Sequence, residues 1–246
     1  MYKLFKMSWL NIRNSLKSKV FFLGILAAFI YSSLWALFVH PKMYGLLEYD
    51  FEMGRFLFLI MLYVAVSILR DDIRFNTNKA VFTGIFSRVE VMISKVMSLI
   101  IWGGIFFAIV EIDNVIIACI LYKKIGINGF LALNHLELFI IYLVIMLVMG
   151  SFMMLAVSIV FKENKAILFL IVFLGMINFY TAGIVTLVNR KPEIAASLTG
   201  YMITPFYNIG VLAQGYFNME SIIINLAWAI LFIISSTIII YRREIR

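Results

Sequence analysis

Apolar residues run almost unbroken through most of the chain, and polar residues gather in the gaps between the runs. Most of the runs are long enough to cross about 30 Å of hydrocarbon as a helix that rises about 1.5 Å per residue. The second run is unbroken only from Phe56 onward, and we expect Arg55 to extend to the outer membrane surface. The pattern predicts six transmembrane helices, at about 20–39, 53–69, 96–120, 138–161, 166–188 and 221–241.

Residues 1–19 have an amphipathic pattern instead of an apolar run. Their apolar side chains recur at the spacing of one helical face, and their cations form a stripe beside it. Such a helix lies in the headgroup plane of a membrane, with its aromatic residues at the acyl boundary. The alternative is a basic flank that only orients the first span. The apolar face comprises Phe5, Trp9, Ile12 and Leu16, and the stripe comprises Lys6, Arg13 and Lys17.

Segment 189–220 contains a further apolar stretch, 194–212, that is long enough to be a seventh span. Pro205 interrupts it, because proline inside a helix removes a hydrogen bond and clashes with the preceding turn. A seventh span would also carry the basic C-terminus to the opposite side of the membrane. We therefore expect two short re-entrant helices that enter from the outer face before the sixth span.

The composition agrees with a membrane-embedded chain, since 64% of the 246 residues are hydrophobic and only 14% are charged. A soluble domain has roughly 25% charged residues. No stretch is polar enough for a separate soluble domain, so the sequence predicts an all-α membrane protein with one domain, 1–246. With six spans, 15 of the 21 lysines and arginines fall on the side of the termini. Because cytoplasmic loops are rich in these cations, we expect both termini in the cytoplasm.

The sequence lacks the common signatures of catalysis and nucleotide binding. It contains no G-x-x-x-x-G-K-[ST] phosphate loop, no H-E-x-x-H and no G-x-S-x-G motif. His40 and His135 fall in expected outer loops, where we predict solvated side chains and no metal pair. We therefore expect no enzyme activity, cofactor or metal in this chain, and no nucleic-acid partner.

Two carboxylates interrupt the third span. Glu111 and Asp113 lie two residues apart, so a helix points them about 200° apart and they cannot share one proton or cation. One of them could line a pathway for a cationic substrate or for protons. The alternative that we favour is that the span bends or ends near Val110 and leaves both at a wet outer mouth, because Asn114 adds polarity on the same turn.

Further pathway candidates lie in the fourth and fifth spans. A methionine-rich face of the fourth span suits either a promiscuous substrate surface or close helix packing, of which we favour the packing. Polar side chains in the outer half of the fifth span could line a pathway or hydrogen-bond to other helices. The candidates are Met149 and Met153, which share a face with Met146 and Gly150, and Asn178, Tyr180 and Thr181.

Residues 71–95 join the second and third spans and carry charges of both signs. The length allows one or two short helices, and the mixed charge suits an aqueous protein interface. An apolar patch with a charged border would give a docking surface an anchor and a rim. A plain solvated loop is the alternative. The patch comprises Phe82, Ile85 and Phe86, and the rim includes Arg88 and Glu90.

This organisation resembles the permease subunits of bacterial type-two ABC exporters. In that family the link after the second span reads approximately E-x-x-x-G-T-L-x-x-L-x-x-x-P-x-S-R, and a lysine follows before the third span. The chain departs from this pattern at Asn76, where the family has glycine, and at Ile85, where it has proline. The matching positions are Asp72, Thr77, Ser87, Arg88 and Lys95, and 204–216 resembles the family's outer P-F segment.

The resemblance implies a coupling helix within 71–95 that docks on a separate ATPase subunit, where ATP and magnesium bind. It also implies two ATPase copies and a second permease chain, identical or homologous, in a bacterial plasma membrane. Subunits of this size occur among exporters of phenol-soluble modulins and among lantibiotic-immunity permeases, so the expected substrate is lipophilic or amphipathic. The coupling role is implied for Asp72, Asn76, Thr77, Phe82, Ile85, Phe86, Ser87, Arg88 and Glu90.

Two other functions remain open from the sequence. A non-transporting membrane scaffold or immunity protein would bind its partner without pumping. A proton-coupled secondary carrier would need Glu111 or Asp113 to face a cavity. Such a carrier would also predict internally repeated halves, and no internal repeat is evident.

Overall fold

The computed structural model describes residues 2–39, 41–42, 44–74, 87–160 and 164–243. Six helices in this part of the chain are long and apolar enough to cross a membrane, which confirms the all-α membrane fold. These helices are α2 (Lys19–Leu34) with its continuation η1 (Trp35–Val39), α3 (Leu46–Arg74), α5 (Arg88–Ile120), α7 (His135–Val160), α8 (Asn164–Arg190) and α11 (Met219–Arg242). The remaining elements are α1 (Tyr2–Leu16), α6 (Gly126–Leu131), η2 (Pro192–Leu198), α9 (Thr199–Met202) and α10 (Pro205–Ala213).

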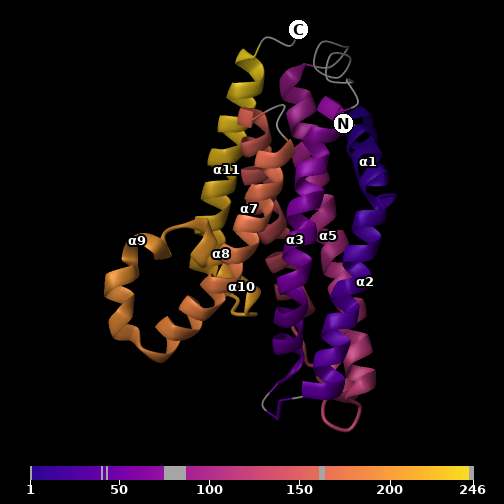
Figure 1. The fold of residues 1–246 in the computed structure, drawn as a ribbon, viewed down its shortest axis with the longest axis vertical. Coiled ribbons are helices and arrows are strands. Elements are labelled where there is room, and N and C mark those ends of the chain that lie inside the picture. Colours follow the sequence, from indigo (N-terminus) through magenta and orange to yellow (C-terminus); the bar gives the residue numbers. More distant parts are fainter. Residues whose placement is uncertain (1, 40, 43, 75–86, 161–163, 244–246) are drawn as a thin grey trace.

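Helices α3 and α7 occupy the centre of the bundle (Figure 1). Most of their residues are buried, whereas α2, α8 and α11 keep most of their apolar side chains on the outside, where lipid would cover them. Helix α7 packs against α3, α5 and α11. Helix α1 begins and α11 ends at the same end of the bundle, as six spans require. We call this the terminal end, and we call the opposite end the outer end after the orientation that the charge bias predicts.

Helix α1 confirms the predicted N-terminal helix and packs along the first part of α5. The Ser8 hydroxyl donates to the backbone carbonyl of Ser94 at 2.7 Å, and Ile12 is fully buried. The aromatic residues Phe5 and Trp9 are about half exposed, on the side away from the bundle. The helix therefore exposes Phe5 and Trp9 of its predicted apolar face but buries Ile12 of the same face, and its place in the headgroup plane stays a prediction. It runs beside α5 toward α2, however, and does not lie apart from the bundle (Figure 1).

The segment between α8 and α11 breaks where the sequence predicted. Thr204 caps α10, and Pro205 takes the first helical position, where its missing N–H costs no hydrogen bond. Gly215 follows α10 with φ +80°, a left-handed conformation that glycine adopts readily. Helix α10 packs against α7, α8 and α11, while η2 packs against α8 and Tyr201 of α9 shares a hydrogen bond with Thr181 of α8 (Figure 1). The structure thus has two short helical pieces here, η2 with α9 and then α10, on either side of Pro205.

Helices α5 and α7 approach each other closely at Gly103. A Cβ atom added there would lie 2.9 Å from the Cα atom of Leu143, which cannot move aside as a flexible side chain can. At the adjacent Gly104 the nearest atom to such a Cβ, in the Phe139 ring, would be 3.8 Å away. The close contact at Gly103 is therefore typical of membrane helices that pack through small residues.

We expect Gly103→Ala to lower the free energy of unfolding by about 1–3 kcal/mol, because it overpacks this contact. Gly104→Ala is the matched control and should leave the stability unchanged or slightly higher, since alanine favours the helix. Thermal unfolding of both variants in one detergent measures the difference. Equal melting temperatures would contradict the close approach of α5 and α7.

Candidate functional site

Acidic and polar side chains lie buried together in the outer half of the bundle. Asp50 of α3 is 4% exposed and Asp113 of α5 is fully buried. The Oδ2 atom of Asp50 accepts a hydrogen bond from Nδ2 of Asn114 at 3.2 Å, and Oδ2 of Asp113 accepts one from the Ser32 hydroxyl at 2.7 Å. These contacts join α2, α3 and α5. We call Ser32, Asp50, Asp113 and Asn114 the acidic cluster.

The hydrogen bonding of the acidic cluster is incomplete. The Oδ1 atoms of Asp50, Asp113 and Asn114 are buried and have no hydrogen-bond partner. No described side chain forms an ion pair with either carboxylate. An unpaired buried carboxylate costs on the order of several kcal/mol, and ionisable residues inside membrane bundles usually have a functional role. The acidic cluster is therefore the first candidate site.

Other ionisable groups at the outer end have partners. Nδ1 of His135, at the start of α7, lies 3.0 Å from the Glu111 carboxylate. The Glu52 carboxylate accepts hydrogen bonds from the Tyr31 hydroxyl and from Nη1 of Arg55, both at 3.2 Å. Arg55 therefore has an acidic partner, and its extension to the membrane surface stays a prediction. The contrast with these paired groups sets the acidic cluster apart.

The structure corrects the expected position of Asp113. Helix α5 continues unbroken to Ile120, so the third span does not end near Val110. Asp113 is enclosed against α2 and does not lie at a wet outer mouth. Glu111 faces His135 instead, so the two carboxylates have different neighbours, as their helical angle predicted.

Neutral replacements at these two carboxylates should change stability in opposite directions. Asp113→Asn removes a buried charge and keeps an oxygen for the Ser32 hydroxyl, so we expect the free energy of unfolding to rise by about 1 kcal/mol or more. Glu111→Gln removes a partly exposed ion pair, so we expect a loss of about 0.5 kcal/mol. Thermal unfolding of both variants tests the pair. A lower melting temperature for Asp113→Asn would mean that the carboxylate stabilises the fold.

Most of the other pathway candidates lie away from the acidic cluster. Met149 and Met153 are almost fully buried in the main apolar core, in agreement with the packing interpretation of the fourth span. Tyr180 is 67% exposed on the outside of α8. Thr181 is buried and shares a hydrogen bond with the hydroxyl of Tyr201 in α9.

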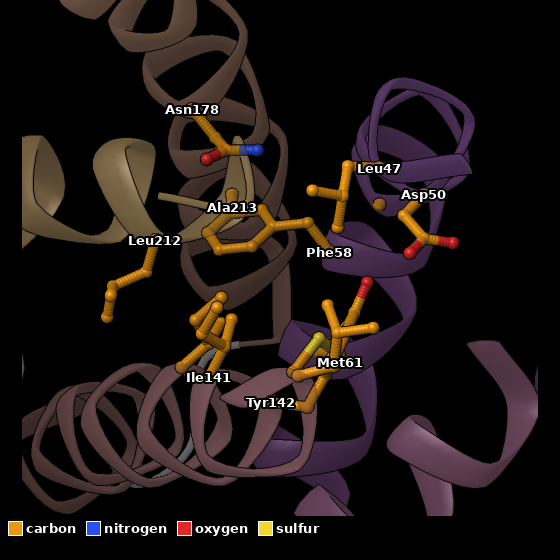
Figure 2. A pocket seen from close by; sticks show the side chains of 13 residues that line it. Leu47, Asp50, Phe58, Met61, Ile141, Tyr142, Asn178, Leu212 and Ala213 are labelled. Atoms are coloured by element: carbon orange, nitrogen blue, oxygen red, sulfur yellow. The ribbon is translucent and has the colours of Figure 1, made fainter. Parts of the chain in front are cut away.

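Asn178 is the pathway candidate that the structure brings close to the acidic cluster. Its side chain lines a cavity together with Asp50 and Tyr142 (Figure 2). Neither Asp50 nor Tyr142 stands out in the sequence pattern. Asp50 stands before the unbroken part of the second apolar run, and Tyr142 is one of 12 tyrosines in the chain.

The start of α5 forms a second candidate site. The Ser87 hydroxyl accepts a hydrogen bond from the N–H of Glu90 at 3.2 Å, and the Glu90 carboxylate accepts one from the N–H of Ser87 at 2.8 Å. This reciprocal pair is a capping box, which fixes the point where the helix begins. The first residue of α5, Arg88, is thereby held at the terminal end of the bundle.

Arg88 and Arg243 tie three helices together at the terminal end. Nη1 of Arg88 donates to three backbone carbonyls at the end of α11, at 2.7–3.0 Å. Nη1 of Arg243 donates to the carbonyl of Ser158, near the end of α7, at 2.6 Å. We call these contacts the helix junction. The carbonyls that accept from Arg88 belong to Ile240, Tyr241 and Arg243.

The rest of the predicted coupling segment lies largely outside the described residues. Asp72 belongs to α3, but its side chain is not among those described. The docking role of the whole segment stays a prediction. The coupling residues beyond the described part of the chain are Asn76, Thr77, Phe82, Ile85 and Phe86.

Comparison with known proteins leaves the interpretation to the geometry. No protein-family model matches the chain, and no curated protein matches it. The acidic cluster and the helix junction are therefore the features from which a function has to be argued.

Proposed function

We propose that this chain is the membrane-spanning permease subunit of an ATP-driven exporter of the type-two ABC class. The observation that carries the proposal is the helix junction. Segment 71–95, in which we predicted the ATPase-docking surface, contains Arg88, and Arg88 is hydrogen-bonded to the end of α11. A rigid tilt received at the start of α5 would therefore reach α11, and through Arg243 also α7.

The other parts of the proposal follow from the sequence. The chain lacks a phosphate loop, so ATP and magnesium would bind to a partner ATPase, expected in two copies with two permease chains. The excess of Lys and Arg on the side of the termini supports a cytoplasmic location for both ends, in a bacterial plasma membrane. The apolar bundle suits a lipophilic or amphipathic substrate, such as a cytolytic or antimicrobial peptide.

The acidic cluster favours a second candidate function, a proton-coupled secondary carrier. Such a carrier needs a carboxylate that faces a cavity, and Asp50 meets this requirement. A non-transporting immunity or scaffold protein is the remaining alternative. The three functions differ in whether an ATPase is bound and in which energy source drives transport.

Purification of the tagged chain from its native membrane in mild detergent tests the proposal. We expect an ATPase with a phosphate loop to co-purify in equal copy number with the permease chains. After reconstitution into vesicles, transport of an amphipathic peptide should require ATP and should survive a protonophore. Transport that continues without an ATPase and stops with the protonophore would select the carrier. A stable complex that transports nothing would select the scaffold.

A further inference from the structure

A small cavity lies in the outer half of the bundle, beside the acidic cluster. It is bounded by α3, α7, α8 and the connection from α10 to α11. Its volume is about 30 Å³, which is room for one group the size of a water molecule. Figure 2 shows the carboxylate of Asp50 and the phenol of Tyr142 on one side of the cavity and the amide of Asn178 on the other.

Asp50 is the one charged residue among those that line the cavity. Its exposed fraction is 4%, so the residue is almost fully buried, and its Oδ1 atom has no hydrogen-bond partner. No described cation pairs with it. Asp113, Glu111 and Glu48 lie near enough to act electrostatically on Asp50. The cavity therefore combines a carboxyl group that has no cationic partner with an unused hydrogen-bond acceptor.

The remaining wall of the cavity is apolar, and this wall limits the kind of cation that could bind. Leu47, Phe58 and Met61 supply much of it. Calcium and magnesium need about six or more oxygen ligands. Among the described residues, no group of three or more His, Cys, Asp or Glu side chains could hold a metal ion. One carboxylate next to apolar side chains suits instead a cation with an apolar stem.

We propose that this cavity binds the ammonium head of a lipophilic or amphipathic amine. The head, which matches the size of the one group that the cavity can hold, would lie opposite Oδ1 of Asp50 and near the Tyr142 phenol, while the apolar stem would extend out of the cavity along its apolar wall. The view that this bound amine is the exported substrate rests on the proposed function, because it names the chemical class of that substrate. The binding itself needs no ATPase and can be measured without one.

Equilibrium binding of radiolabelled octylamine to the purified full-length chain tests the proposal. The chain is placed in phosphatidylcholine nanodiscs, and empty discs correct for partition of the amine into lipid. We expect one saturable site per chain. Asp50→Asn should weaken its affinity at least tenfold, because the charge partner of the ammonium group is lost. Glu220→Gln should bind like the parent, since this exposed carboxylate lies at the start of α11 and does not line the cavity.

Three results would overturn the proposal. If octanol displaces radiolabelled octylamine as effectively as unlabelled octylamine does, the pocket is apolar and charge has no role in binding. Sodium that displaces octylamine at constant ionic strength would show a site for inorganic cations. An equal loss of affinity in Glu220→Gln would show only a general surface-charge effect.

A second variant keeps the test decisive if Asp50→Asn does not give folded protein. Tyr142→Phe removes only the phenol oxygen from the cavity wall, and we expect it to weaken octylamine binding about threefold or more. Unchanged affinity in that variant would also overturn the proposal. Since no ATPase is present, saturable binding is informative even when none co-purifies with the chain. Likewise, absence of octylamine binding would not decide the exporter proposal, which the co-purification and transport experiment tests.

Discussion

Replacing Phe82 or Phe86 by alanine should remove most ATP-driven transport while the chain still inserts and assembles its spans. The two aromatic residues are four positions apart, so they would share one face of a coupling helix. Truncation of an aromatic anchor at a desolvated contact costs about 2 kcal/mol or more, which is roughly a 30-fold loss of affinity. The measurements are the affinity of the ATPase for the permease in nanodiscs and the amount of substrate moved per ATP hydrolysed.

Val81→Ala is the matched control, because position 81 would lie about 100° from Phe82 and about 140° from Phe86 on the same helix, away from the aromatic face. Substitutions in a solvated loop usually change free energies by no more than about 0.5 kcal/mol. We therefore expect the control to behave like the parent. If Phe82→Ala and Phe86→Ala also bind the ATPase and transport substrate like the parent, segment 71–95 is a plain loop and the exporter proposal fails.

The six spans could be predicted from hydropathy because their apolar runs are long, but the start of α3 could not. This helix begins at Leu46, several residues before the expected start at position 53. Asp50 and Glu52 lower the average hydropathy of its first turns, although both are almost fully buried. Hydropathy measures how well a segment dissolves in lipid. It does not measure how well neighbouring helices can enclose its polar groups.

The acidic cluster could not be predicted for a related reason. The sequence shows that Asp113 is charged, but Ser32, which hydrogen-bonds to it, lies 81 positions earlier in the chain. Asp50 and Asn114 are separated by 64 positions. Periodicity relates residues within one helix only. The pairing of α2, α3 and α5 therefore decides which polar groups meet, and that pairing is a property of the packed bundle.

Helix α1 shows how a correct periodicity can leave the packing face unassigned. The aromatic stripe was correctly placed on one face, but Ser8 and Ser15 lie on the face that is buried against the bundle. Lipid is as apolar as an aromatic side chain, so aromatic residues gain little by entering a membrane bundle. Small residues allow close helix contact and short hydrogen bonds, and they are enriched at such interfaces.

Arg88 shows the same difference between a residue type and its contacts, and it leads to a prediction that departs from the sequence interpretation. As a charge on the rim of a docking surface, Arg88 would contribute little, and its contribution would weaken with salt. In the structure its guanidinium instead donates to three carbonyls at the end of α11. Carbonyls in the last turn of a helix lack partners within the helix, and the helix dipole favours a cation there.

We expect Arg88→Ala to lower the substrate moved per ATP about tenfold or more, because hydrogen bonds of this charged kind contribute about 1.5–3 kcal/mol each. ATPase binding should be largely kept, since the lost contacts lie within the bundle. Arg88→Lys should restore only part of the transport, as a lysine ammonium cannot reproduce the planar fork of donors. Arg242→Ala is the matched control, because this exposed arginine has no described hydrogen-bond partner at the same end of α11.

Ionic strength separates the two roles of Arg88. Contacts of the helix junction lie between backbone carbonyls and a half-buried guanidinium, so the transport defect of Arg88→Ala should be the same in low and high salt. A rim charge would give a different result: weaker ATPase binding at low salt, a defect that fades as salt is added, and normal transport by each ATPase that remains bound. That second pattern would show that Arg88 belongs to the ATPase-docking surface. It would also show that the helix junction does not transmit the movement of α5 to α11.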